Sequence, residues 1–153
     1  MTGNSQLYTV VQGSFGYLDP AYAETRIATH SIDVYAFGIV LFELVSGKPP
    51  MIQRTTGTGE YIHIVQWAKP HIQRGNLSSI ADPCFSENRN VSSIWKVIDI
   101  ALMCVDHDRE KRPTMNEVKL ELQSALSMEL ESSVSDATEQ MTYLIENIDV
   151  NVR

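Results

Sequence analysis

The feature that most constrains the fold is an apolar run of 15 residues, IDVYAFGIVLFELVS, at positions 32–46. Gly47 follows the run, and Pro49 and Pro50 come soon after, so a regular element must end there. The many Val and Ile residues would suit a buried strand, but the length of the run favours a helix. Because apolar residues lie on nearly every side, we predict a central helix that is buried all round.

Three further helices are predicted from apolar residues spaced three or four apart, at 61–73, 91–105 and 113–126. Pro70 is expected to kink or break the first of them, and Pro113 suits the first position of the last. Together with the central run, these segments predict a mainly α fold with four main helices.

The segments between these helices are predicted to be irregular. Residues 51–60 and 76–90 are rich in turn-forming residues and are expected to form loops. Residues 1–30 lack a sustained period and are expected to form a loop with one short helical turn near Pro20. Ser31 is expected to cap the central helix.

Charge divides the chain into two parts. The formal net charge is −7, and without a basic excess we expect no binding to nucleic acid. Residues 127–153 hold six acidic residues and one basic residue, a net charge of −5, whereas residues 1–126 carry −2. We therefore predict a folded domain over 1–126 and an acidic, mobile tail over 127–153, with a weak helix at 141–148 as the alternative.

Cysteines and hydropathy bear on the compartment. Cys84 and Cys104 give no disulfide framework, and buried free thiols in a reducing compartment are expected. The N-terminal residues do not resemble a signal peptide. The longest apolar stretch, 36–45, contains Glu43 and is shorter than the roughly 20 residues that a bilayer requires. We expect no membrane segment in this chain, and a soluble intracellular protein if it exists alone.

Four segments carry the functional signal, and none of them is specific by itself. In chain order they are GSFGYLDPAY at 13–22, DVYAFG at 33–38, VQWAKPHIQRGNLSSIADPCF at 65–85 and IALMCVDHDREKRPTM at 100–115. Together they resemble the end of the kinase domain of plant receptor-like Ser/Thr protein kinases, of the type with leucine-rich-repeat or malectin-like ectodomains. The resemblance covers about residues 8–126. It implies the helical C-terminal lobe of the kinase fold, from the end of the activation segment to the last helix.

The resemblance assigns roles to two groups of residues. The substrate-facing loop would contain Gly13, Ser14, Gly16 and Tyr17, and the structural motifs would contain Asp19, Pro20, Asp33 and Arg112. In the family, Asp33 accepts hydrogen bonds from the catalytic loop; the residues themselves indicate only a carboxylate at a helix N-terminus. Candidate phosphorylation sites, from their place in the activation loop, are Ser5, Tyr8, Thr9 and Ser14; the alternative is an unmodified polar loop.

Arg112 marks a departure from the family pattern. In the family this arginine pairs with a glutamate, but the corresponding position here is Ala21. Removing one partner of a buried ion pair costs about 3–5 kcal/mol. We therefore expect the departure to weaken the fold unless Asp19 or Glu24 compensates.

The residues that perform kinase chemistry do not occur in the 153 residues. Phosphoryl transfer requires a glycine-rich loop, a strand lysine, an HRD aspartate and a DFG aspartate. Gly57-Thr58-Gly59 has the wrong context, and His107-Asp108-Arg109 has the wrong order. No catalytic, cofactor-binding or metal-binding residue is assigned, and the scattered histidines lack metal-ligand spacing. ATP and magnesium are implied only for the intact family.

Three functions follow as alternatives. The first is part of a receptor kinase at the cytoplasmic side of the plasma membrane, which phosphorylates protein substrates or partner kinases. The second is a non-catalytic docking or regulatory fragment, and the third is the product of a pseudogene. In the family, elements before Met1 cover part of the central helix. We therefore also expect an apolar patch of more than a few hundred Å² and low stability for this chain alone.

Overall fold

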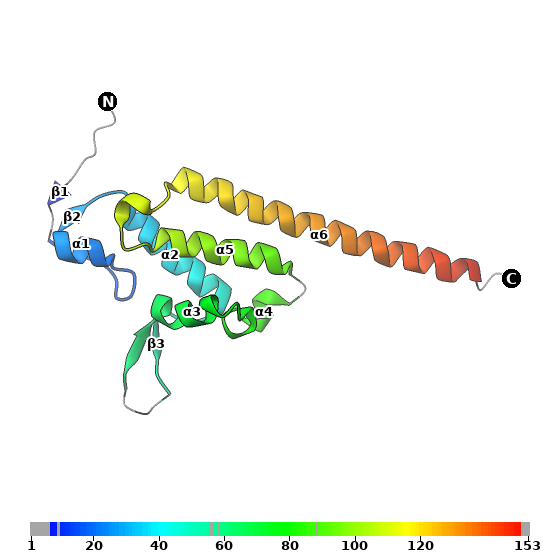
Figure 1. Ribbon diagram of the computed structural model, residues 1–153, viewed down its shortest axis with the longest axis horizontal. Coiled ribbons are helices and arrows are strands. Elements are labelled where there is room, and N and C mark those ends of the chain that lie inside the picture. Colours follow the sequence, from blue (N-terminus) through cyan, green and yellow to red (C-terminus); the bar gives the residue numbers. More distant parts are fainter. Residues whose placement is uncertain (1–6, 9, 56, 58, 88, 151–153) are drawn as a thin grey trace.

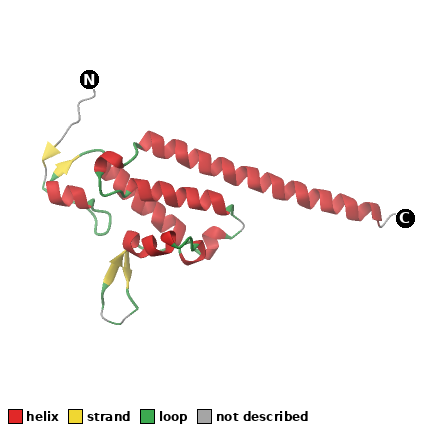
Figure 2. Cartoon of the chain, in the orientation of Figure 1, coloured by secondary structure: helices red, strands yellow, loops and turns green. Residues whose placement is uncertain are grey.

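The computed structural model describes residues 7–8, 10–55, 57, 59–87 and 89–150, and helices dominate it (Figures 1 and 2). The four main helices α2, α3, α5 and α6 confirm the predicted fold class. In chain order the elements are β1 (Leu7–Tyr8), α1 (Pro20–Thr25), β2 (Ile27–Ala28), α2 (Ser31–Ser46), β3 (Met51–Gln53), β4 (Tyr61–His63), α3 (Ile64–Gln73), η1 (Leu77–Ser79), α4 (Pro83–Ser86), α5 (Val91–Cys104), η2 (Arg109–Lys111) and α6 (Met115–Val150).

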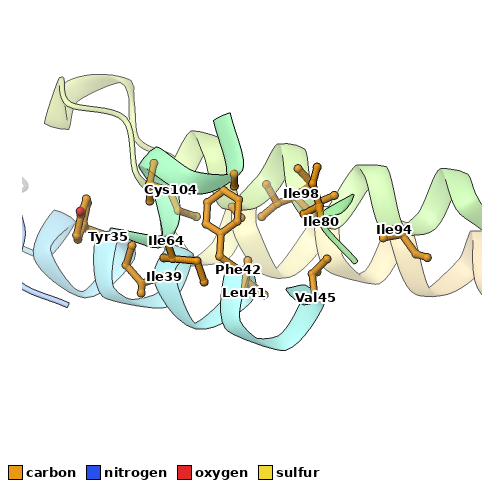
Figure 3. Packing of buried hydrophobic residues seen from close by; sticks show 14 of the residues in the cluster. Tyr35, Ile39, Leu41, Phe42, Val45, Ile64, Ile80, Ile94, Ile98 and Cys104 are labelled. Carbon is orange, nitrogen blue, oxygen red and sulfur yellow. The ribbon is translucent and has the colours of Figure 1, made fainter. Parts of the chain in front are cut away.

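The core forms where α2 packs against α5, which in turn packs against α6 (Figure 1). Phe42 and Ile39 of α2 and Ile98 of α5 are almost completely buried, as Figure 3 shows. Gly38 allows the two helices to approach closely, because a Cβ atom there would lie 2.7 Å from the Cβ of Cys104. The predicted ranges of these two helices differ from the observed ones by one residue at one end. Gly47 ends α2 with a left-handed φ of 64°.

One side of α2 is not buried within this chain; the sequence analysis predicted burial all round but also an apolar patch on this helix in the chain alone. Val40 is 37% exposed and Leu44 is 61% exposed, while Ile32, Ala36 and Phe37 are half-buried. Neighbours among these residues recur three or four positions apart along the helix and form one stripe, opposite the faces that contact α3 and α5. The size and consequences of the resulting apolar patch stay predictions.

A β-hairpin replaces the loop predicted at 51–60 and the first turn of the helix predicted at 61–73. Strands β3 and β4 are antiparallel, with Met51 opposite His63 and Gln53 opposite Tyr61. Helix α3 begins only at Ile64. Pro70 does not break it, because the lost hydrogen bond involves the carbonyl of Gln66, whose residue is exposed and can be solvated.

Two short strands and a helix occupy part of the region predicted as a loop before α2. Strand β1 pairs antiparallel with β2, and α1 occupies the place of the turn predicted near Pro20. Ser31 is not the cap of α2: the cap position is His30, and the Ser31 hydroxyl lies 2.7 Å from that of Thr29.

Helix α6 begins later and ends later than the prediction of 113–126. Pro113 lies before the helix, and Thr114 and Glu117 form a capping box at its start: Thr114 N donates to the Glu117 carboxylate at 2.7 Å, and Glu117 N donates to Thr114 Oγ1. No Gly or Pro occurs between Met115 and Val150, so no helix-breaking residue ends α6 near residue 126, where the sequence analysis had ended it. The proposed domain boundary at 126 and the mobility of the tail stay predictions.

Candidate functional site

The residues before α2 form a tight loop that one glycine makes possible. Gly16 has a φ of +89°, and a Cβ atom there would lie 2.8 Å from the Cβ of Pro50. Both the backbone conformation and the space therefore require glycine. Gly13 has no such φ, and an added Cβ would meet only the flexible end of Leu18. Tyr17 N donates to Ser14 O at 3.0 Å, which closes the turn.

Two side chains from other elements hold this loop against the body. His63 Nδ1 accepts from Val65 N at the start of α3, so Nε2 carries the proton that donates to Gly16 O at 2.9 Å. Tyr17 donates its hydroxyl to Glu43 of α2 at 2.7 Å. This hydrogen bond, together with desolvation and the negative charge of Glu43, raises the pKa of Tyr17. The sequence analysis had counted His63 only among the scattered histidines that lack metal-ligand spacing.

A buried ion pair joins the segment to the far end of the chain. Asp19 and Arg112, 93 residues apart, form two hydrogen bonds of 2.7 and 2.8 Å. Their side chains are 0% and 1% exposed. Asp19 Oδ1 also accepts from Ala21 N at 3.0 Å and so caps α1. The family's glutamate is replaced here by Ala21, and Asp19 takes its place as the partner of Arg112. Glu24, the other candidate partner, is exposed.

Arg112 connects three parts of the molecule through one guanidinium. Besides Asp19, it donates to Ser31 O at the start of α2 and to Asp106 O in the connection after α5. The guanidinium also lies 5.1 Å from the centre of the Tyr35 ring. Arg112 is thus paired with Asp19, one of the two residues that the sequence analysis named as able to compensate for the missing glutamate. Whether Ala21→Glu would stabilise a longer kinase domain stays a prediction.

Arg109 is a second anchor, which the sequence analysis missed. Its guanidinium donates to the carbonyls of Ala21 and Ile27 and to the hydroxyl of Thr25. Ala21 lies in the first turn of α1, Thr25 is its last residue, and Ile27 lies just beyond it. Arg109 therefore contacts the whole length of this short helix. The sequence carried a weak signal for this role, namely a second arginine three positions before Arg112 within the RPTM-containing segment.

The sequence-predicted residues separate into two places. A groove brings Gly13, Ser14, Tyr17 and Asp33 together, and Asp33 is exposed on the first turn of α2. Asp19 and Arg112 lie apart from that groove, in the interior. A neighbouring cavity of about 680 Å³ is lined by the loop from Gly13 to Gly16, by Pro20, and by side chains of other elements that include Tyr35, His63, Lys69 and His107.

Of the candidate phosphorylation sites, the structure places only Ser14 with its side chain. Ser14 is exposed. Ser5 and Thr9 lie outside the described residues, and for Tyr8 only its backbone in β1 is described.

The cysteines differ from each other. Cys104 is completely buried, and burial raises the pKa of its thiol to about 11. Cys84 is exposed, so the expectation that both thiols are buried was wrong for this one. Within the described part of the chain, no group of three or more His, Cys, Asp or Glu residues is arranged to hold a metal ion.

Comparison with known proteins identifies the family of this chain. Residues 1–122 match the protein kinase domain. The chain belongs to the protein kinase family. It is 37% identical over 147 residues to a probable LRR receptor-like protein kinase of Arabidopsis thaliana, and 40% identical over 121 residues to a probable LRR receptor-like serine/threonine-protein kinase of the same plant.

These alignments cover 96% and 79% of the chain but only 16% and 13% of the two relatives. A solved structure, the pseudokinase domain of BIR2, an immune regulator of the RLK/Pelle family, matches with a TM-score of 0.63 and 28% identity. That match covers 76% of this chain and 34% of the BIR2 chain. The chain is therefore a partial protein kinase domain, similar to plant LRR receptor-like Ser/Thr kinases, as the motifs predicted.

The relatives are named as receptor-like kinases, and a receptor is commonly anchored in a membrane, so the question is whether a helix of this chain could span a bilayer. No helix in the described ranges combines the length and the apolar character needed to cross a bilayer.

Proposed function

We propose that this chain forms the substrate-facing end of the kinase lobe of a receptor-like Ser/Thr kinase. The intact protein would transfer phosphate from ATP to hydroxyl groups of protein substrates or partner kinases, at the cytoplasmic side of the plasma membrane. The observation that carries the proposal is the fastening of the loop at Gly13–Asp19. His63 holds Gly16, and the buried Asp19–Arg112 pair holds the end of the loop, beside a cavity of about 680 Å³.

A loop fixed in this way suits the presentation of a peptide, because a rigid surface loses little conformational entropy on binding. Ser14 and Tyr17 border the groove, and Asp33 faces it from α2. Under this proposal, Asp33 accepts hydrogen bonds from the catalytic loop of the intact kinase. Ser14, which is exposed, is the candidate site of regulatory phosphorylation.

We further propose that the 153 residues alone do not transfer phosphate. The glycine-rich loop, the strand lysine and the HRD and DFG aspartates that bind ATP and magnesium do not occur in this sequence. ATP and magnesium would be bound by other parts of the intact kinase. This chain would contribute the positioning of the protein substrate.

The test compares this chain with the longest polypeptide that its transcript encodes. Mapping the 5′ end of the transcript gives the reading frame before the Met1 codon. We expect a frame that encodes the missing motifs, and a product that phosphorylates a generic protein substrate with radiolabelled ATP while this chain does not. Phosphate transfer by the chain alone would contradict the proposal, and so would an inactive product that carries all the motifs.

A transcript that starts near the Met1 codon would instead favour a non-catalytic docking or regulatory fragment. One observation supports this second candidate: the exposed stripe on α2 with Val40 and Leu44 offers an apolar surface to a partner protein. The solved relative BIR2, described as a pseudokinase and an immune regulator, shows that a domain with this fold can have a regulatory role. If the gene is a pseudogene, we expect no stable polypeptide near 17.2 kDa in the cell.

A further inference from the structure

Helix α6 leaves the body of the protein after Glu129. Up to that residue it faces α5, with Val118 and Ala125 buried. The Glu129 carboxylate accepts hydrogen bonds from Asn90 N and Ser93 Oγ at the start of α5. Figure 1 shows the rest of α6 projecting past the end of α5. In this view the projecting part lies beyond the other described helices.

The projecting part carries a regular apolar seam. Its members follow one another at intervals of four, three, four and three residues, which is the spacing of the a and d positions of a coiled coil. Each of its four large side chains is more than half exposed. The seam consists of Leu130, Val134, Ala137, Met141 and Leu144, and the sequence continues it at Ile148.

The direction of the seam leaves room for a partner helix. At 100° per residue, it lies about a third of a turn around α6 from the side that faces α5. A helix packed along the seam would therefore not displace α5. The seam begins one residue after Glu129, the last residue of α6 that bonds to α5.

The charges beside the seam select the partner. In this register the flanking positions are 131, 133, 138, 140 and 145, and of these only Glu131 is charged. Asp136 and Glu139 point away from the seam by their register. A basic partner helix would need acidic residues at the flanks, which pair across a coiled coil. A second copy of this acidic chain, in contrast, meets little repulsion there.

The apolar residue types favour the same partner. In parallel coiled coils, a β-branched residue at a and leucine at d favour two strands. Val134 and Met141 occupy a, while Leu130 and Leu144 occupy d with Ala137 between them. We propose that residues 130–148 form a parallel, two-stranded coiled coil with the same segment of a second copy of this chain. Such a pair holds two kinase lobes at the same end of the seam.

The seam is short, under three heptads, so the dimer is expected to depend on protein concentration. Sedimentation velocity of the 153-residue chain, over about a hundredfold range of concentration, measures this. The substitution Met141→Glu places a charge in the seam. It should not disturb the folded body, because Met141 is 62% exposed in the single chain. The matched control is Leu44→Glu, on the exposed stripe of α2, where the side chain is 61% exposed.

We expect the mass of the wild-type chain to rise from 17.2 kDa toward twice that value as the concentration increases. Met141→Glu should stay monomeric over the same range, and Leu44→Glu should behave as the wild type does. A monomeric wild-type chain would overturn the proposal. Association that survives Met141→Glu, or that Leu44→Glu abolishes, would also overturn it and would place the contact on α2 or elsewhere.

Cross-linking tests the direction of the helices. In a Cys84→Ser background, which removes the exposed native thiol, Leu144→Cys brings two thiols together only if the strands are parallel. Rapid formation of a disulfide-linked dimer under mild oxidation is expected. In an antiparallel pair, position 144 would face the region of 134, and no cross-link at Leu144→Cys would contradict the parallel arrangement.

Discussion

The helical body and the segment before it are held together by different forces. In α2, α3 and α5, side chains such as Phe42, Ile64 and Ile98 are almost completely buried and pack together (Figure 3). The segment from residue 10 to residue 30, in contrast, is fastened largely by polar contacts to distant residues. The two guanidinium groups of Arg109 and Arg112 make most of those contacts.

This difference bears on how each region responds to change. Apolar packing is non-directional, and its strength follows the area buried, so the body tolerates changes in shape that preserve volume. A buried ion pair requires both partners in position, and losing one partner leaves a charge without compensation. A single polar substitution is therefore expected to detach the segment before α2, which in our proposal faces the substrate, while the same kind of change leaves the body in place.

The largest effect is expected in the body. Phe42→Ala removes a side chain that is 1% exposed and leaves a cavity between α2 and α5. The free energy of unfolding should fall by about 3–5 kcal/mol. Urea denaturation followed by circular dichroism measures this. Leu44→Ala, on the exposed side of the same helix, should change it by less than about 0.5 kcal/mol, and equal effects of the two would contradict the packing described.

Gly16→Ala tests the backbone of the loop. The alanine must adopt a φ of +89° and meets Pro50, so a loss of about 1–3 kcal/mol is expected. Gly13→Ala is the matched control, because it requires no positive φ and meets only a flexible side chain. The melting temperatures of the two variants measure this. If Gly13→Ala lowers the melting temperature as much as Gly16→Ala does, the turn does not depend on a left-handed glycine.

Arg109→Gln tests the second anchor. It removes charged donors from the carbonyls of Ala21 and Ile27, and each such hydrogen bond contributes about 1.5–3 kcal/mol. Hydrogen exchange should accelerate at the amides of residues 21–28, while the amides of α5 stay protected. The control Lys111→Gln changes an exposed side chain and should leave the exchange unaltered. Equal acceleration of exchange at residues 21–28 and in α5 would mean that residues 21–28 do not open separately from the body.

Tyr17→Phe is expected to have the smallest effect, and one that depends on pH. The folded state raises the pKa of Tyr17, mainly through its hydrogen bond to Glu43. A raised pKa stabilises the fold fully below the unfolded value of about 10 and loses that contribution as the pH rises through the folded value. The stability advantage of the wild type over Tyr17→Phe should therefore disappear in alkaline solution. An advantage that grows above pH 10 would contradict this.

The sequence predicted elements with a long period and clear ends. Helix α2 is followed by Gly47, and α5 is preceded by Asn90, whose side chain caps it, so their ranges were nearly correct. The β3–β4 hairpin was missed because each strand has only three residues and shows little alternation. The end of α6 was placed too early because the apolar spacing that predicted the helix was followed only as far as Leu126, although no Gly or Pro occurs before Val150.

The candidate site was predictable only in part. The motif resemblance named Asp19 and Arg112, but it left open whether Asp19 or Glu24 replaces the glutamate that is missing at Ala21. The choice of Asp19 as partner depends on the arrangement in space of residues 93 positions apart, which no local pattern contains. The same holds for His63 and Arg109, whose roles depend on the carbonyls that they meet.

The most direct test of the central claim, that the Asp19–Arg112 pair fastens the segment before α2 to the body, is a double-mutant cycle. Asp19→Asn retains a cap for α1 and removes the charge, and Arg112→Met removes the guanidinium. Urea denaturation should show a loss of about 3–5 kcal/mol for Asp19→Asn alone, and a double variant more stable than the sum of the single losses predicts. Strictly additive losses, or a loss for Asp19→Asn no larger than that for Glu60→Gln in the exposed pair with Arg54, would contradict the claim.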